Sequence, residues 1–270
     1  MQKIEELFES RKKWQNNRAS AIFPCYVNDK NDQIISFQNY WKWKNNIFDA
    51  RFYISLRDEQ SNKYIKKEFK ILEHNQFSIK NNFKIKNFSG VIECEIISKH
   101  NLRFPFPAII CFYKNNSGLI SCVHSSGRVL NKNEKQKDNF FEESNFHCKL
   151  NKDFEPFIHL FNGNYYRKKD YGAEIKIYNF KNKLLLKKKV ITNLLKPYSS
   201  KIILLSKVLS LKDKKKLENK NFFIKIKFKG KNIYGRLVVG NYDKINDALF
   251  TTHTLSVFKK SDEKDFITPK

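Results

Sequence analysis

Glycine and proline are scarce in this chain. Its 270 residues include 8 glycines and 6 prolines, which argues against low-complexity linkers. Hydrophobic residues make up 40% of the chain, so there is enough apolar material for a folded protein and a disordered polycation is excluded. The length is long for one domain and sufficient for two, each with its own core.

Long apolar runs, a signal peptide and cysteine pairs are also missing. No apolar run approaches the ~20 residues that a membrane-spanning helix needs. The opening residues, MQKIEELFES, carry too many charges for a signal peptide. The five cysteines are odd in number and form no CxxC motif, which favours a reducing compartment over a disulfide framework. We therefore expect a cytoplasmic protein.

Known catalytic and cofactor motifs are absent as well. There is no glycine-rich phosphate loop, no HExxH, no GxSxG and no zinc knuckle. The acidic residues, 27 against 53 basic ones, are dispersed and leave little material for a two-carboxylate mechanism. We predict no cofactor and no metal site, and the absence of these motifs argues against an enzyme.

Arginine is scarce too, which bears on the net charge of +26. Only eight of the 53 basic residues are arginine, so lysine supplies the other 45. Lysine, asparagine, isoleucine and phenylalanine have codons rich in A and T, so a bias toward these bases would raise the lysine content without a functional reason. Proteins that recognise nucleic acids rely on arginine instead. A lysine-coated solvated surface is therefore the favoured interpretation, and a polyanion footprint is the alternative.

What the sequence does contain is one pattern that occurs twice. The segment 104–128, FPFPAIICFYKNNSGLISCVHSSGR, reads as strand, turn and strand, and 237–253, LVVGNYDKINDALFTTH, repeats it 129 residues later. Earlier matches occur at a constant offset of 123. Matches at the start, middle and end of the unit indicate an internal duplication. The matched pairs are Ile109 and Val238, Tyr113 and Tyr242, His124 and His253, Asn28 and Asn151, Asn39 and Asn162, and Ala50 and Ala173.

Short alternating segments with turns between them predict an all-β fold. We expect two tandem, internally duplicated antiparallel β-sandwich domains with a short N-terminal helix. Strands are expected within 34–43, 48–56, 64–72, 83–88, 90–97, 108–113, 119–124 and 223–229, and a capped helix or loop from Ser210. The expected boundaries are an amphipathic helix at 1–20, a first domain at 21–130, a polar linker at 131–145, a second domain at 146–258 and a polar tail at 259–270.

The two matched histidines are the first candidate site. His124 and His253 end matching strands beside hydroxyl residues, and Arg128 follows the first of them. If the two units pack together, the histidines would face each other across a cleft and bind a ligand, or act as catalytic residues if the protein is an enzyme. The favoured alternative is that each histidine bonds to its own backbone, because no companion has metal-ligand spacing.

Aromatic residues beside asparagine form the second candidate site. Their rings and amides suit sugars or bases, and the alternative is that the rings pack a core and the asparagines make turns. The two interpretations are equally supported. The residues are Asn39, Tyr40, Trp41, Asn162 and Tyr165.

Lysines on one strand face form the third candidate site. Residues 181–232 carry seventeen lysines against Asp213 and Glu218, and FIKIKFK alternates lysine with apolar residues. Such a face would bind a polyanion or nucleic acid, or is simply a solvated face or a protected sheet edge. The candidates are Lys187, Lys188, Lys189, Lys225, Lys227 and Lys229.

The sequence thus favours a non-catalytic binding protein whose ligand is a glycan or another protein. Polyanion binding through the lysine-rich part of the second domain is the first alternative. An enzyme with His124 and His253 between the domains is the second.

Overall fold

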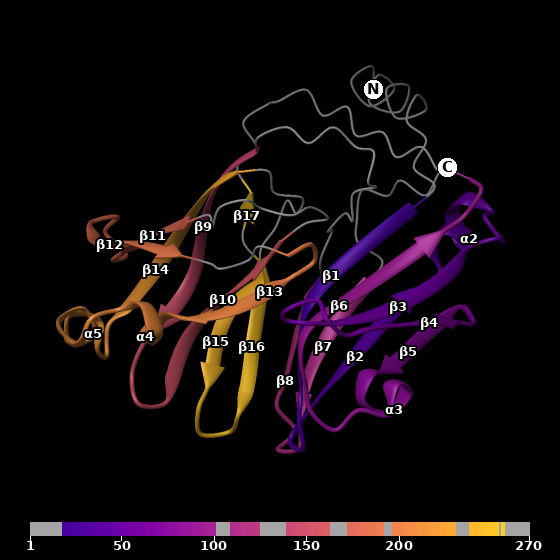
Figure 1. The fold of residues 1–270 in the computed structure, drawn as a ribbon, viewed down its shortest axis with the longest axis horizontal. Helices are drawn as coiled ribbons and strands as arrows, with labels where there is room; N and C mark the ends of the chain where they lie inside the picture. Colours follow the sequence, from indigo (N-terminus) through magenta and orange to yellow (C-terminus); the bar gives the residue numbers. More distant parts are fainter. Residues whose placement is uncertain are drawn as a thin grey trace.

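The computed structural model describes residues 18–100, 109–124, 139–162, 172–191, 196–230, 238–253 and 255–256. Within these ranges the chain is mostly β-strand, arranged in four antiparallel sheets with a few short helices (Figure 1). The prediction of an all-β fold is confirmed. Residues 18–124 are called the first half below, and residues 139–256 the second half.

The first half holds two four-stranded sheets. Their strand orders are β1-β6-β3-β4 and β5-β2-β7-β8. The elements are β1 (Arg18–Val27), β2 (Asn31–Gln38), α2 (Tyr40–Asn45), β3 (Arg51–Asp58), β4 (Tyr64–Phe69), β5 (His74–Ser78), α3 (Ile79–Phe83), β6 (Phe88–Ile97), β7 (Ile109–Asn115) and β8 (Ile120–His124).

The second half holds a five-stranded and a four-stranded sheet. Their strand orders are β12-β11-β14-β9-β17 and β13-β10-β15-β16. The elements are β9 (Asn139–Lys149), β10 (Phe154–Phe161), β11 (Gly172–Tyr178), β12 (Leu184–Ile191), β13 (Ser200–Leu204), α4 (Leu205–Val208), α5 (Leu211–Leu217), β14 (Asn221–Gly230), β15 (Val238–Asp243), β16 (Ala248–His253) and β17 (Leu255–Ser256).

Alternating burial explains where the strands form. In β3, Phe52, Ile54 and Leu56 are fully buried while Arg51 is exposed, as the two-residue repeat of a strand requires. In β14, Ile224 and Ile226 are buried in the same way. Burying these side chains stabilises each strand by about 1.5–3 kcal/mol per large apolar residue. All five cysteines are free thiols, and four of them, all except Cys122, are buried.

Two helices stand where the sequence predicts strands or connections. Trp41 and Trp43 lie in α2 and not in a strand, because the Asn39 side chain accepts a hydrogen bond from Lys42 N and starts a helix there. The strand predicted at 83–88 does not form before Phe88, since α3 ends at Phe83, Lys84 takes the left-handed conformation, and β6 begins at Phe88. The helix alternative at Ser210 is the observed one, with Ser210 as the N-cap of α5.

The predicted domain boundaries also need two corrections. Residues 18–20 belong to β1 and not to an N-terminal helix, and residues 1–17 lie outside the described residues. Residues 139–145 belong to β9 and not to a linker. Polar composition misled the prediction at 139–145, because a strand with a solvated face carries as many polar residues as a linker.

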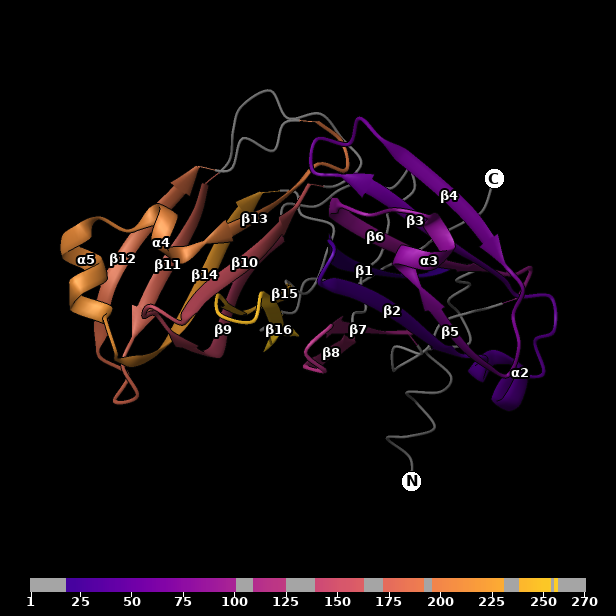
Figure 2. The same ribbon diagram turned by 90° about the horizontal axis from the view of Figure 1, so that it is seen from below.

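The two halves lie side by side and share apolar packing (Figures 1 and 2). The core of the first half contains residues of both its sheets and also includes Phe157, Val238 and Leu249 of the second half. A second core contains residues of both sheets of the second half, among them Ile175, Ile158 and Phe222. The sheet β13-β10-β15-β16 therefore contributes to both cores, and the sheet β12-β11-β14-β9-β17 lies on the side remote from the first half.

Candidate functional sites: the seam and the lysine face

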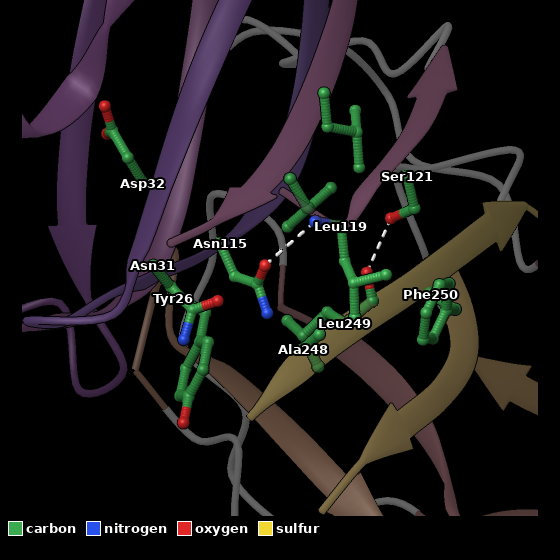
Figure 3. Close-up of a pocket in the computed structure, with 11 residues that line it drawn as sticks. Tyr26, Asn31, Asp32, Asn115, Leu119, Ser121, Ala248, Leu249 and Phe250 are labelled. Carbon is green, nitrogen blue, oxygen red and sulfur yellow. Dashed lines mark hydrogen bonds between the residues drawn. The ribbon is translucent and has the colours of Figure 1, made fainter. Parts of the chain in front are cut away.

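The two halves meet where β8 lies beside β16. Both strands are the last strands of their sheets, and they run side by side in the same direction (Figure 3). The Ser121 hydroxyl donates a hydrogen bond to Leu249 O at 2.5 Å and accepts one from Thr251 N at 3.3 Å. The Ser121 side chain thus bonds to the backbone C=O and N–H groups of β16, as the backbone of a paired strand would. We call the contact between β8 and β16 the seam.

A carboxylate binds both halves near the start of the seam. Asp247, in the turn between β15 and β16, accepts hydrogen bonds from the Tyr26 and Tyr242 hydroxyls at 2.9 and 2.8 Å. It also accepts bonds from the amides of Asn28 and Asn31 at 3.0 and 3.1 Å. Three of these four donors come from the first half, so Asp247 holds the halves together. We call this group the Asp247 cluster.

Burial and the hydrogen bond to Asp247 raise the pKa of both Tyr26 and Tyr242. Both phenols therefore remain protonated and keep donating at physiological pH. The Tyr26 and Tyr242 rings also meet edge to face, with centroids 6.4 Å apart, a favoured arrangement for aromatic pairs.

A small pocket opens beside the seam, with walls from both halves (Figure 3). Tyr26, Asn31 and Asn115 line it from the first half, and Ala248 and Leu249 from the second. Its cavity volume is about 10 Å³, which is the room that about one water molecule requires. The pocket is too small for a small-molecule ligand, since such pockets measure roughly 300 Å³ or more.

Loss of the Ser121 hydroxyl will weaken the seam. Ser121→Ala leaves Leu249 O and Thr251 N without this partner, so we expect the free energy of unfolding to fall by roughly 1–2 kcal/mol. The measurement is urea unfolding followed by circular dichroism. Cys122→Ala is the matched control, because Cys122 is exposed on the same strand. A Ser121→Ala midpoint equal to that of the control would show that the hydroxyl adds nothing.

The histidines predicted to form a site end the two seam strands. His124 is half-buried and lies opposite Ile110 at the end of β8. His253 lies opposite Val238 at the end of β16, and its side chain is outside the described residues. His124 and His253 are the last residues of β8 and β16, and since the two strands run in the same direction (Figure 3), both strands end toward the same end of the seam. Arg128 is also outside the described residues, which contain no cluster of three or more metal-ligating side chains.

Three residues of the aromatic-asparagine candidate are buried: Trp41, Asn39 and Asn162. Trp41 is 2% exposed and stacks on Phe37 with centroids 5.9 Å apart. Asn39 caps α2. Asn162 is buried, and its side-chain amide donates to Lys196 O at 2.6 Å. Tyr40 is half-buried and Tyr165 lies outside the described residues, so the described members form no common surface.

Lysines gather on the outer face of the sheet that is remote from the first half. Lys176 of β11 lies directly opposite Lys187 of β12 and Lys225 of β14, so the three share a face. Lys189 lies on the same face, opposite Glu174. We call Lys176, Lys187, Lys189 and Lys225 the lysine face. Two acidic residues share this face: Glu174, which contacts Lys187 at 2.9 Å and Lys176 at 3.4 Å, and Glu142 of β9, which lies opposite Lys227 in the strand register.

Three of the predicted polyanion contacts lie elsewhere or are only partly described. Lys188 lies on the opposite face of β12 and pairs with Asp213 of α5 at 2.5 Å. Side chains alternate along a strand, so a run of three lysines cannot put all three on one face. Lys227 lies opposite Glu174 in the register of β14, and Lys229 follows it. The side chains of Lys227 and Lys229 are outside the described residues.

The matching face of the first half is charge-balanced. On the outer face of β4, β3 and β6, Arg51 pairs with Glu68 at 2.7 Å and Lys66 with Glu95 at 2.9 Å. Arg57 approaches Glu93 to 3.5 Å. Each cation on this face has an acidic partner, whereas on the lysine face Glu174 is the one carboxylate that pairs with lysines among the side chains that the structure describes.

Sequence reasoning missed His159, which lies in β10. It is 4% exposed, and its Nε2 has no hydrogen-bond partner among the described residues. It lies opposite Ile202 and on the same strand face as Phe157, which packs in the core of the first half. Burial lowers the pKa of His159 to about 3, so the ring is neutral at physiological pH. The signal was one histidine in the apolar run FEPFIHLF.

Comparisons of the chain with known proteins gave no match. No family model, no curated protein and no solved structure matches it. Among the described residues, no helix has the length and apolar character needed to cross a membrane.

Proposed function

We propose that this chain is a non-catalytic binding protein built from two duplicated β-sandwich domains, and that its ligand is a polyanion bound by the lysine face. The observation that carries the proposal is the clustering of lysines from three neighbouring strands on one outer face. Polyanions bind such a face because each neutralised phosphate or sulfate releases counterions.

The duplication is supported by equal strand orders. The order β1-β6-β3-β4 becomes β9-β14-β11-β12 when each strand is replaced by its counterpart in the second half, and β5-β2-β7-β8 becomes β13-β10-β15-β16. Each pair of sheets encloses one core, which is the arrangement of a sandwich.

Matched asparagines also make matched hydrogen bonds. Asn28 Oδ1 accepts from the backbone N–H groups two and three residues later, at 2.9 Å each. Asn151 Oδ1 does the same at 2.9 and 2.7 Å. Asn39 N donates to Glu73 O just before β5, and Asn162 N donates to Ser199 O just before β13. One ancestral unit explains all six hydrogen bonds, because Asn28 and Asn151, and Asn39 and Asn162, stand at the same offset of 123 residues.

Codon bias does not explain where the lysines lie. A bias toward A and T raises the lysine content of the whole chain, but the equivalent face of the first half pairs Arg51, Arg57 and Lys66 with one glutamate each. A polyanion is also favoured over a glycan, since Trp41 and Asn162, which would contact a sugar, are buried.

The proposal predicts salt-sensitive binding that depends on where the lysines lie. We expect fluorescein-labelled heparin and a labelled 20-nucleotide oligo(dT) to bind at 50 mM salt. The variant Lys176→Gln/Lys187→Gln/Lys225→Gln should lower the slope of log K against log salt for oligo(dT) by about 2, since each lost phosphate contact removes about 0.7. Fluorescence anisotropy across 50–200 mM salt measures this slope.

The control removes the same charge from the first half. Lys63, Lys70 and Lys86 are all exposed there, and Lys63→Gln/Lys70→Gln/Lys86→Gln should leave the slope nearly unchanged. If both triple variants lower the slope equally, binding depends on net charge and not on where the lysines lie. If neither heparin nor oligo(dT) binds at 50 mM salt, the proposal is refuted.

A further inference from the structure

A row of rings borders the lysine face. Phe223 of β14 lies directly opposite Tyr178 of β11 on one side and His147 of β9 on the other. The Tyr178 and Phe223 rings stack with centroids 5.3 Å apart and planes 11° apart. Phe180, two residues beyond Tyr178, contacts the His147 ring at 5.4 Å and is 61% exposed. We call these four residues the ring row.

The ring row and the lysines are neighbouring rows of one sheet face. Lys225 follows Phe223 by two residues, and Lys176 precedes Tyr178 by two, so each lysine shares a face with its ring at about 7 Å along the strand. The Lys225 ammonium lies 5.1 Å from the centroid of the Tyr178 ring, within the range of a cation–π contact. Cations and ring faces are thus presented together.

These rings are not needed by the core. The inward positions of the same strands are filled by Ile177 and Phe222, which are fully buried. Leu184 of β12, opposite Tyr178, continues the row and is 47% exposed. Phe180 and Leu184 are exposed, and Tyr178 and Phe223 between them are half-buried. Adjacent apolar residues that reach the surface and are rimmed by charge mark an interaction site, whereas single exposed apolar residues are ordinary.

We propose that the ligand of this face is a single-stranded nucleic acid, with its phosphates on the lysine face and its bases stacked on the ring row. This inference rests on the proposed function and narrows it. Base stacking on aromatic side chains beside a basic track is how proteins bind single strands without sequence preference. A duplex hides its base faces, and heparin has none, so neither uses the ring row.

A ring substitution will separate single strands from other polyanions. We expect Phe180→Ala to weaken oligo(dT) binding about 5- to 100-fold, the range for loss of one base–ring stack. Its affinity for heparin should stay within twofold of the wild type. Phe48→Ala is the matched control, because Phe48 lies in the first half and is 72% exposed. Anisotropy titrations with both labelled probes and a 20-base-pair duplex give the three affinities.

Each outcome decides a different claim. If Phe180→Ala binds oligo(dT) as Phe48→Ala does, or if the duplex binds the wild type as tightly as oligo(dT), the single-strand inference fails. The polyanion proposal still stands in that case if the lysine triple variant loses binding. If light scattering shows a dimer that Phe180→Ala dissociates, the ring row is a contact between two copies, and the inference also fails.

Discussion

Replacing Asp247 by alanine is expected to lower the free energy of unfolding by roughly 2–4 kcal/mol. Its carboxylate accepts four hydrogen bonds, from Tyr26, Asn28, Asn31 and Tyr242. Hydrogen bonds to a charged group contribute about 1.5–3 kcal/mol, and donors left without a partner add a cost of their own. Asp247 also has a φ of 51°, a left-handed conformation that aspartate tolerates better than alanine.

A graded pair of variants tests this assignment. Asp247→Asn keeps the shape and the left-handed preference but turns an amide N–H₂ toward either the asparagine or the tyrosine donors, so we expect an intermediate loss. Asp29→Ala is the control, since Asp29 is an exposed carboxylate in the neighbouring turn of the first half, and surface substitutions change stability by about 0.5 kcal/mol or less. Urea unfolding gives the three values. An Asp247→Ala loss no larger than that of the control would contradict the role of the Asp247 cluster.

Acid will destabilise the protein through His159. Burial lowers the pKa of His159 to about 3 in the folded state, while an exposed histidine has a pKa of about 6.5. Above pH 6.5 the ring is neutral in both states and contributes no pH dependence. Between about pH 6.5 and pH 3 the histidine is protonated in the unfolded state and neutral in the folded state. The free energy of unfolding therefore falls by roughly 1.4 kcal/mol for each unit by which the pH is lowered.

His159→Leu should remove this component of the acid sensitivity. Carboxylates whose pKa is lowered by a partner, such as Glu174 beside Lys187, also lose stability in acid, so the informative quantity is the difference between wild type and variant. We expect the stability of His159→Leu relative to wild type to rise steadily from pH 6.5 to pH 4. His74→Leu is the control, because His74 is exposed. Parallel pH curves for wild type and His159→Leu would exclude a buried neutral histidine.

The sequence predicted those parts of the fold that depend on local alternation. Phe52 and Ile54 face inward, as do Ile224 and Ile226. The alternation of apolar and polar residues in the sequence predicts this, because every second side chain of a strand lies on the same face. At Ser210 the sequence predicts a capped helix or a loop, because its side chain can cap a first helical turn, and the helix is the one observed. The alternation in FIKIKFK likewise predicts that Lys225, Lys227 and Lys229 share one face, whereas the run of lysines at 187–189 has no alternation from which a face follows.

Features that depend on distant contacts were not predictable. The acceptor role of Asp247 requires β1, β2 and β15 to meet, and nothing in the turn DKIND indicates that meeting. Strand β5 was missed because its sequence, HNQFS, has too few apolar residues to show a period. Trp41 was assigned to a strand because aromatic residues favour strands, whereas the Asn39 cap and core packing select a helix. The ring row is not evident from the sequence because its members come from β9, from β14, and from β11 with the turn that follows it, which are separate segments of the chain.

The seam has a consequence for how copies of this chain would associate. It joins two different edges, β8 of one half and β16 of the other, and each edge shields the other from unwanted strand pairing. A molecule whose seam opened would present both edges at once, and each would fit the opposite edge of another copy. Such an exchange is head to tail, so it closes into a ring or grows into an open polymer. The hydroxyl of Ser121 and the carboxylate of Asp247 therefore also act against polymerisation.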